Sequence, residues 1–147
     1  MPLQLEIVTP EAKIFSDEVT TVVLPGSLGE MGVLPNHAPI VTALLPGELR
    51  FTKDNVVTEL AIGEGFVEVT GSTVKVLTDL AVSEAGIDES TVQAALDRAQ
   101  ARMKDAALMG AEEIAAVEAS IAKSLVQLKL KRKRRALKSG TPPSGRP

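Results

Sequence analysis

Hydrophobic residues follow two different periods along this chain, and the period changes near residue 87. In the first part, short β-branched segments alternate apolar and polar positions, as half-buried strands do. These segments are Leu3–Ile7, Val19–Leu24, Val56–Leu60, Phe66–Val69 and Val74–Leu77. Turn-forming residues separate them at 9–12, 46–47, 53–55 and 70–72. Residues 1–86 are therefore predicted to form an all-β domain, either a sandwich or a barrel.

From Asp88 onward the apolar period is helical. Apolar residues recur at spacings of three and four along two stripes: Val92, Leu96, Ala99, Met103 and Ala106, and then Ile114, Val117, Ile121, Leu125 and Leu128. Asp88 suits an N-cap, and Gly110 interrupts the run. Residues 87–138 are thus predicted to form a helical hairpin that turns near Gly110. Residues 139–147, rich in Gly, Pro and Ser, are predicted to be a disordered tail.

Charge divides the chain at the same place as the period. Residues 1–87 hold 4 basic and 12 acidic residues, whereas residues 88–147 hold 12 basic and 7 acidic ones, within a net charge of -3. The 147 residues include no Cys, which excludes disulfides and thiolate metal sites. No apolar run approaches the roughly 20 residues of a membrane span, and the N-terminus lacks a signal-peptide pattern, so no membrane insertion is expected.

The segment Gly26–Arg50 concentrates turn-forming residues around one acid and the only histidine. Four glycines and the prolines around them require several sharp turns, which favours a contact surface over an active site. Leu28 and Met31 are candidate apolar tips, and Glu30 either contacts a partner or solvates the turn. His37 has no Cys or second His, so a structural or subunit contact is favoured and no metal site is predicted.

A basic cluster closes the second predicted helix. It comprises Lys129, Lys131, Arg132, Lys133, Arg134 and Arg135. Such a run either binds an acidic partner or complements the helix dipole, and its length favours a partner. Nucleic acid is disfavoured, because the rest of the chain is acidic and has no Tyr or Trp for base stacking.

Several segments resemble the epsilon subunit of the bacterial rotary ATP synthase. They are Leu3–Val19, VVLPGSLGEMGVLPNHAPIVTALLPGELR at Val22–Arg50, GFVEV at Gly65–Val69 and VKVLTDLA at Val74–Ala81, within a likeness over residues 3–135. The resemblance implies a β-sandwich followed by a two-helix C-terminal domain. It also implies a non-catalytic rotor subunit, not an enzyme. Asn36 replaces the glycine common before the family's His-Ala-Pro, and a positive φ is expected there.

The resemblance also implies partners and a location. The sandwich would bind the gamma subunit and the membrane-embedded ring, through candidates Leu28, Glu30, Met31 and His37. The helices would lie folded or extend along gamma to the catalytic beta and alpha subunits and restrain ATP hydrolysis, with the basic cluster meeting an acidic segment of beta. The complex would lie at the cytoplasmic face of the bacterial inner membrane. The alternative is a stand-alone β-sandwich module that binds a ligand or partner and carries a basic helical tail.

Some members of this family bind ATP through an Ile-Asp-x-x-Arg-Ala motif. Here Ile87 and Asp88 match, but Thr91 and Val92 replace Arg-Ala, so the cation that would offset phosphate charge is missing. Arg98 is the remaining basic candidate on the first helix. We therefore expect weak or absent ATP binding, and no cofactor.

Overall fold

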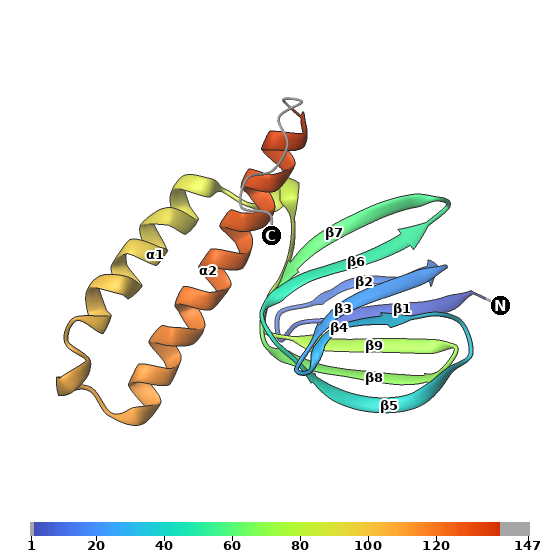
Figure 1. Cartoon of the computed structure of the whole chain (residues 1–147), viewed down its shortest axis with the longest axis horizontal. Coiled ribbons are helices and arrows are strands. Elements are labelled where there is room, and N and C mark those ends of the chain that lie inside the picture. Colours follow the sequence, from blue (N-terminus) through green and yellow to red (C-terminus); the bar gives the residue numbers. More distant parts are fainter. Residues whose placement is uncertain (1, 139–147) are drawn as a thin grey trace. The chain divides into compact units, whose positions relative to one another are not determined.

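The computed structural model describes residues 2–138, and the predicted tail at 139–147 lies outside them. The chain divides into two compact units between Ser83 and Glu84, three residues before the boundary that the periodicity suggests. Each unit is described by itself. Figure 1 shows the strands of the first unit and the helices of the second.

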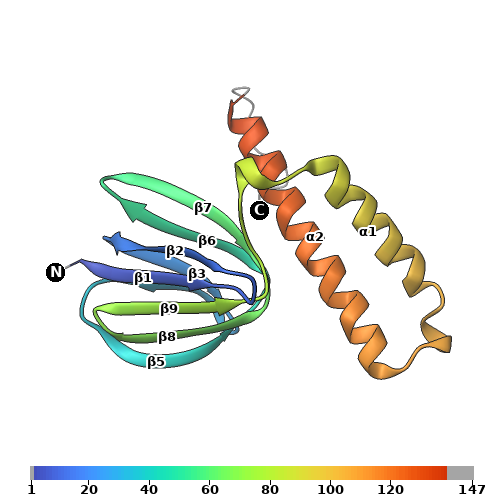
Figure 2. The ribbon, with the colours of Figure 1, turned by 180° about the vertical axis from the view of Figure 1, so that it is seen from behind.

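The first unit is a β-sandwich of ten strands curved around one core (Figures 1 and 2). The strands are β1 (Leu3–Val8), β2 (Lys13–Val19), β3 (Thr21–Gly26), β4 (Gly29–Val33), β5 (His37–Leu44), β6 (Gly47–Lys53), β7 (Val56–Ile62), β8 (Gly65–Gly71), β9 (Thr73–Thr78) and β10 (Ala81–Ser83). Their hydrogen-bonded order is β10-β7-β6-β3-β5-β8-β9-β1-β2, with β4 paired to β3. The predicted sandwich is confirmed, although Val19–Leu24 is divided between β2 and β3 at Thr20.

Two features position β1 and β2 at one end of this strand order. β1 pairs in parallel with β9, so that Leu5 lies beside Val74 in the register. At the other end of β2, the Thr20 amide donates to the Thr52 carbonyl at 2.8 Å, and Lys53 forms an ion pair with Asp17. The terminal strand β2 is thereby held against β6, an interior strand of the order, which closes the sandwich.

Alternate residues of the strands point inward and build the core. The sixteen buried members are Leu3, Leu5, Ile7, Val19, Val22, Leu24, Val33, Leu44, Leu49, Phe51, Leu60, Ile62, Val67, Val69, Val74 and Val76. The rings of Phe15 and Phe51 lie 4.5 Å apart between centroids. Gly65 is required by packing, because a Cβ there would lie 1.9 Å from the Leu77 carbonyl oxygen.

The second unit is the predicted helical hairpin. It contains a 3-10 turn η1 (Glu84–Gly86), α1 (Glu89–Met103), a 3-10 turn η2 (Ala106–Leu108) and α2 (Ala111–Lys138). Asp88 is the N-cap of α1, as predicted, and its carboxylate accepts from the Thr91 amide. Val92, Leu96 and Ala99 are buried on α1, which confirms the first stripe in its central part.

The second predicted stripe is wrong at one position. Leu125 is 50% exposed, while Ser124 is buried. Residues seven apart lie on nearly the same face of a helix, so Val117 and Ser124 share a face that the apolar pattern assigned to Leu125. Leu130 is completely buried and was absent from the predicted stripe.

Candidate functional site

The tip of the β3–β4 hairpin is the most exposed apolar point of the first unit. Leu28 lies in the two-residue turn between the strands and is fully exposed. Gly29 follows with φ of 121°, a conformation that favours glycine. The glycines and prolines of this segment predict sharp turns, but most of the range from Gly26 to Gly32 is paired β-strand. The tip is therefore presented on a fixed hairpin.

The candidates beside this tip have different environments. Glu30 is exposed and its Oε2 lies 3.1 Å from Nη2 of Arg50, which holds the carboxylate beside β6. Met31 is not an exposed tip, since it is half-buried and packs against the core. Leu28 and Glu30 are thus the members of the predicted set that a partner could contact at the hairpin itself.

His37 begins β5, directly after Asn36, whose φ of 67° confirms the expected left-handed conformation. The ring Nδ1 of His37 lies 2.7 Å from the Ala38 carbonyl oxygen. Because a carbonyl only accepts, Nδ1 carries the proton in this contact. In a neutral ring with this tautomer, Nε2 is the nitrogen that can accept a hydrogen bond from a partner.

An apolar row crosses the outer face of the sandwich. The register places Ala43, Phe66, Leu77 and Val8 side by side on β5, β8, β9 and β1. Phe66 is 58% exposed, whereas the chain's other two aromatic residues pack against each other. Sequence reasoning missed this row. Phe66 and Glu68 alternate with the buried residues of β8 and so lie on its outer face, and an aromatic residue on that face was the signal that could have revealed the row.

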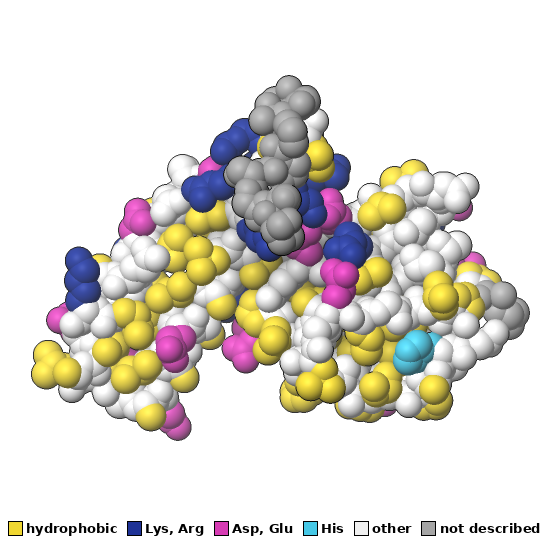
Figure 3. Space-filling model, viewed as in Figure 1, with side chains coloured by type: hydrophobic (Ala, Val, Ile, Leu, Met, Phe, Trp, Pro, Cys, Tyr) yellow, Lys and Arg dark blue, Asp and Glu magenta, His cyan; other side chains and the backbone are white. Residues whose placement is uncertain are grey.

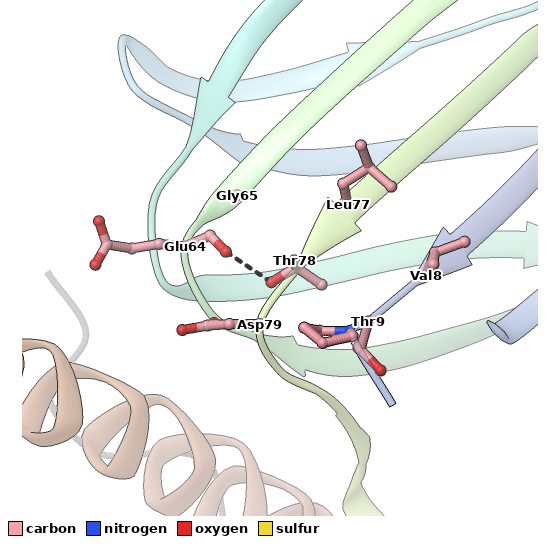
Figure 4. Close-up of a pocket in the computed structure, with 8 residues that line it drawn as sticks. Val8, Thr9, Glu64, Gly65, Leu77, Thr78 and Asp79 are labelled. Atoms are coloured by element: carbon pink, nitrogen blue, oxygen red, sulfur yellow. Dashed lines mark hydrogen bonds between the residues drawn. The ribbon is translucent and has the colours of Figure 1, made fainter. Parts of the chain in front are cut away.

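A shallow hollow of about 360 Å³ lies at one end of this row (Figure 4). Its lining residues are Val8, Thr9, Pro10, Glu64, Gly65, Leu77, Thr78 and Asp79. The Thr78 hydroxyl donates to the Glu64 carbonyl at 3.0 Å, so this hydroxyl in the wall of the hollow is already used within the sandwich. The hollow extends the apolar surface and brings no nucleophile and base together.

The basic cluster lies on the last turns of α2, where Figure 3 shows basic side chains gathered. Nε of Arg132 lies 3.0 Å from Oε2 of Glu89, and Nη1 of Arg135 lies 2.5 Å from Oε1 of the same carboxylate. The Arg132 hydrogen bond is the main cause that lowers the pKa of Glu89 below its usual 4.5. Two of the predicted cluster residues thus converge on one acid at the start of α1.

The other members of the cluster are arranged differently. Lys131 reaches η1, with Nζ 3.4 Å from Oε1 of Glu84 and 3.3 Å from the Glu84 carbonyl oxygen. Lys129 is exposed on α2. Lys133 and Arg134 also have polar partners within the protein. Three members of the cluster, Lys131, Arg132 and Arg135, are therefore paired with carboxylates of the same chain, so the cluster is not simply a solvated helix end.

The structure does not bring the nucleotide-site candidates together. Ile87 is buried, and Asp88 is used as a cap, where hydrogen bonds from Ser90 and from the Thr91 amide lower its pKa. Arg98 instead lines a hollow of about 280 Å³ between α1 and α2, together with Arg102 and Ser120, and neither Ile87 nor Asp88 belongs to that hollow.

Residues 2–138 offer neither a metal cluster nor a helical membrane span. Within that range, no group of three or more His, Cys, Asp or Glu side chains is placed to hold a metal ion. None of the helices described there has the length and apolar character needed to cross a bilayer.

Comparison with known proteins identifies the class. The family model for the β-sandwich domain of the ATP synthase delta/epsilon chain matches residues 2–84. The ATP synthase epsilon chain of Herpetosiphon aurantiacus is 38% identical over 135 residues, covering 92% of this chain and 98% of the relative. Epsilon chain 2 of Syntrophotalea carbinolica is 45% identical over 103 residues, or 70% of this chain and 75% of the relative.

A solved structure supports the same fold. A chain in the Euglena gracilis mitochondrial ATP synthase, in a structure that includes OSCP, F1 and the c-ring, aligns with a TM-score of 0.61 and 24% identity, covering 92% of this chain and 81% of that one. The chain belongs to the ATP synthase delta/epsilon family. The resemblance in the sequence is thereby confirmed, as is the expectation of an ATP synthase subunit without an active site of its own.

Proposed function

We propose that this chain is a rotor subunit that couples the gamma subunit to the membrane-embedded ring, and that its helices restrain ATP hydrolysis. The observation that carries the proposal is the match to an epsilon chain over nearly the whole length of both proteins. In this role the chain works at the cytoplasmic face of the bacterial inner membrane. It supplies contact surfaces and no chemistry.

The β3–β4 hairpin is the proposed contact with the ring. Fully exposed Leu28 offers an apolar anchor, and Glu30, fixed by Arg50, offers a carboxylate beside it. An exposed apolar residue on a fixed backbone loses little conformational entropy on binding. Met31 contributes indirectly, because its side chain packs against the core and so holds the hairpin in place.

The apolar row is the proposed contact with gamma. It lies in the same sheet as β5, which carries His37, and exposed aromatic side chains are typical interface anchors. Residues 1–83 hold 4 basic and 11 acidic residues, so a segment of gamma with apolar and basic side chains would fit this surface. We expect Phe66→Ser to weaken gamma binding at least tenfold, with Thr70→Ser on the same strand as the matched control.

The helical unit is the proposed regulatory part. The basic cluster would bind an acidic segment of the beta subunit when the helices extend toward the catalytic head. Neutralising residues 131–135 should then raise ATP hydrolysis modestly, and added salt should reduce the difference.

Co-purification tests the assignment of the chain. A tagged copy expressed in its source cells is expected to bring down gamma and the catalytic subunits. The Phe66→Ser variant should bring down less of both, while Thr70→Ser behaves as the unmodified protein does. Recovery of the tagged chain without any ATP synthase subunit would refute the rotor proposal.

Truncation before Asp88 tests the regulatory part separately. The remaining residues include the complete sandwich, so the truncated chain should still assemble. ATP hydrolysis by the complex should rise. Unchanged hydrolysis in a fully assembled complex would reject inhibition by the helices.

Nucleotide binding is predicted to be weak or absent, because Arg98 lies apart from Ile87 and Asp88 along α1. Calorimetric titration of ATP into the isolated chain should give no saturable heat in the micromolar range. A micromolar dissociation constant would contradict this prediction.

A further inference from the structure

Contacts between the two ends of the second unit depend on residues far apart in the sequence. Glu89 stands in the first turn of α1, and Arg132 and Arg135 stand in the last turns of α2. A third contact joins the same ends, because Nη2 of Arg132 donates to Oε1 of Gln93 at 2.9 Å. These contacts exist only while the two helices lie side by side at this end.

The arrangement differs from ordinary surface charge. Both oxygens of Glu89 are used, one by each guanidinium, and only 26% of its side chain is exposed. Ion pairs with two charge-assisted hydrogen bonds to one carboxylate are stronger than isolated exposed pairs. Lys131 adds a neighbouring contact to Glu84, which extends the pairing to η1.

We propose that Glu89, Arg132 and Arg135 form an ionic latch that keeps the helical hairpin closed and withholds these two arginines from an acidic partner. The inference rests on the proposed regulatory function and names how it is controlled. A carboxylate of the partner and the carboxylate of Glu89 compete for the same guanidinium groups. Extension toward the partner therefore requires that the latch open first.

The latch sets the fraction of molecules in which the hairpin is open. A partner that binds only the open state has its apparent affinity reduced by the fraction of molecules that are open. Breaking the latch raises that fraction without changing the arginines that the partner would contact. Glu89→Gln does this, since it removes the acid and leaves both guanidinium groups.

Spin labels on the isolated full-length chain measure the opening directly. The chain has no Cys, so Ala94→Cys on α1 and Leu125→Cys on α2, both at exposed positions, give one unique pair. We expect Glu89→Gln to increase the population of long interspin distances about fivefold. The control Glu118→Gln makes the same change of charge at an exposed position of α2 and should leave the distances unchanged.

A mutant cycle separates the latch from a general effect on α1. If the pairs act together, Arg132→Gln with Arg135→Gln should open the hairpin as far as Glu89→Gln does, and combining all three should add little. Circular dichroism confirms that each variant remains helical. Fully additive opening, an unchanged distance in Glu89→Gln, or equal opening in Glu118→Gln would overturn the latch.

ATP hydrolysis by the assembled complex provides a second measurement, in which the two kinds of variant should have opposite effects. Glu89→Gln should strengthen the restraint on ATP hydrolysis, because more helices are free to extend and the arginines remain. Replacing both arginines should weaken the restraint, although it opens the same latch. If truncation before Asp88 leaves hydrolysis unchanged, the proposed regulatory function fails, while the distance measurement still decides whether the latch exists.

Discussion

The sandwich and the helical unit differ in what holds their elements together. The sandwich buries sixteen Leu, Ile, Val and Phe side chains in one core. In contrast, α1 buries only Val92, Leu96 and Ala99, and α2 buries only Val117, Leu128 and Leu130 among its apolar residues. Ion pairs join the helices at both ends, Arg102 with Glu113 near the turn and Glu89 with the arginines at the open end.

This difference separates a fixed part from an exchangeable one. Apolar burial contributes roughly 25 cal/mol per Å² and is lost only when the core opens. Exposed ion pairs contribute little each and can be exchanged for pairs with another protein. A scaffold with one stable core and a hairpin with replaceable contacts suits a subunit that must stay attached while one part moves.

The largest effect is expected from Gly65→Ala in the sandwich. The added Cβ would overlap the Leu77 backbone, so we expect a loss of about 3 kcal/mol or more in the free energy of unfolding. Urea denaturation followed by circular dichroism measures this loss. Gly110→Ala is the control, since a Cβ added there would have nothing within 4 Å, and it should be neutral or slightly stabilising. Similar stability for the two variants would show that the close approach at Gly65 is not restrictive.

Leu96→Ala tests whether the two units unfold separately. It removes the largest buried side chain of α1 and should destabilise the hairpin by about 2–3 kcal/mol. Amide hydrogen exchange should then accelerate along α1 and α2, while the amides of β1 and β9 keep their protection. Equal acceleration in both units would remove the distinction between a fixed and an exchangeable part.

Asp88→Ala should have a smaller and local effect. The N-cap accepts from the Thr91 amide, and its loss should cost about 1 kcal/mol of helix stability. Asp88→Asn keeps the acceptor and should retain most of that stability. Exchange rates of the first-turn amides of α1 provide the measurement, and identical rates in both variants would argue against the cap.

The smallest effect on the hairpin is expected from protonation of the Glu89 carboxylate at low pH. Its pKa is lowered by Arg132 and Arg135, so the ionised form stabilises the closed hairpin above pH 4.5, and the contribution is lost as the pH falls through the lowered value. The spin-label distances of the unmodified chain should therefore converge with those of Glu89→Gln as the pH falls below 4.5. A difference that stays constant as the solution is acidified would exclude titration of Glu89 as the cause.

The sequence was sufficient to locate those strands and helices in which apolar residues recur at one regular spacing. Alternation in Phe66–Val69 and Val74–Leu77 located β8 and β9, and spacing of three and four located the helices. The strand β4 was missed, because the glycines and prolines around it predict turns, whereas the predicted strand Val19–Leu24 covers most of β3. Leu125 was misplaced, because the buried position on that face holds a small polar residue, Ser124.

The candidate site was predictable only where a side chain is distinctive by itself. Leu28 is exposed as expected, and the left-handed conformation at Asn36 follows from its residue type. The apolar row depends on the register of β1, β5, β8 and β9, and the pairing of Glu89 with Arg132 depends on how two helices align. Neither follows from local patterns, since the row brings Val8 beside Leu77 and the helices bring Glu89 beside Arg132, and both pairs are distant in the sequence.

The parallel pairing of β1 with β9 has a consequence for synthesis of the chain. Leu5 emerges from the ribosome early, yet its neighbour Val74 is added only when the sandwich is almost complete. Pairings so distant in sequence slow folding, because a long loop must close before they form. The first strand can therefore complete its pairing only after β9 has been translated, and the helices follow a domain that has just become able to close.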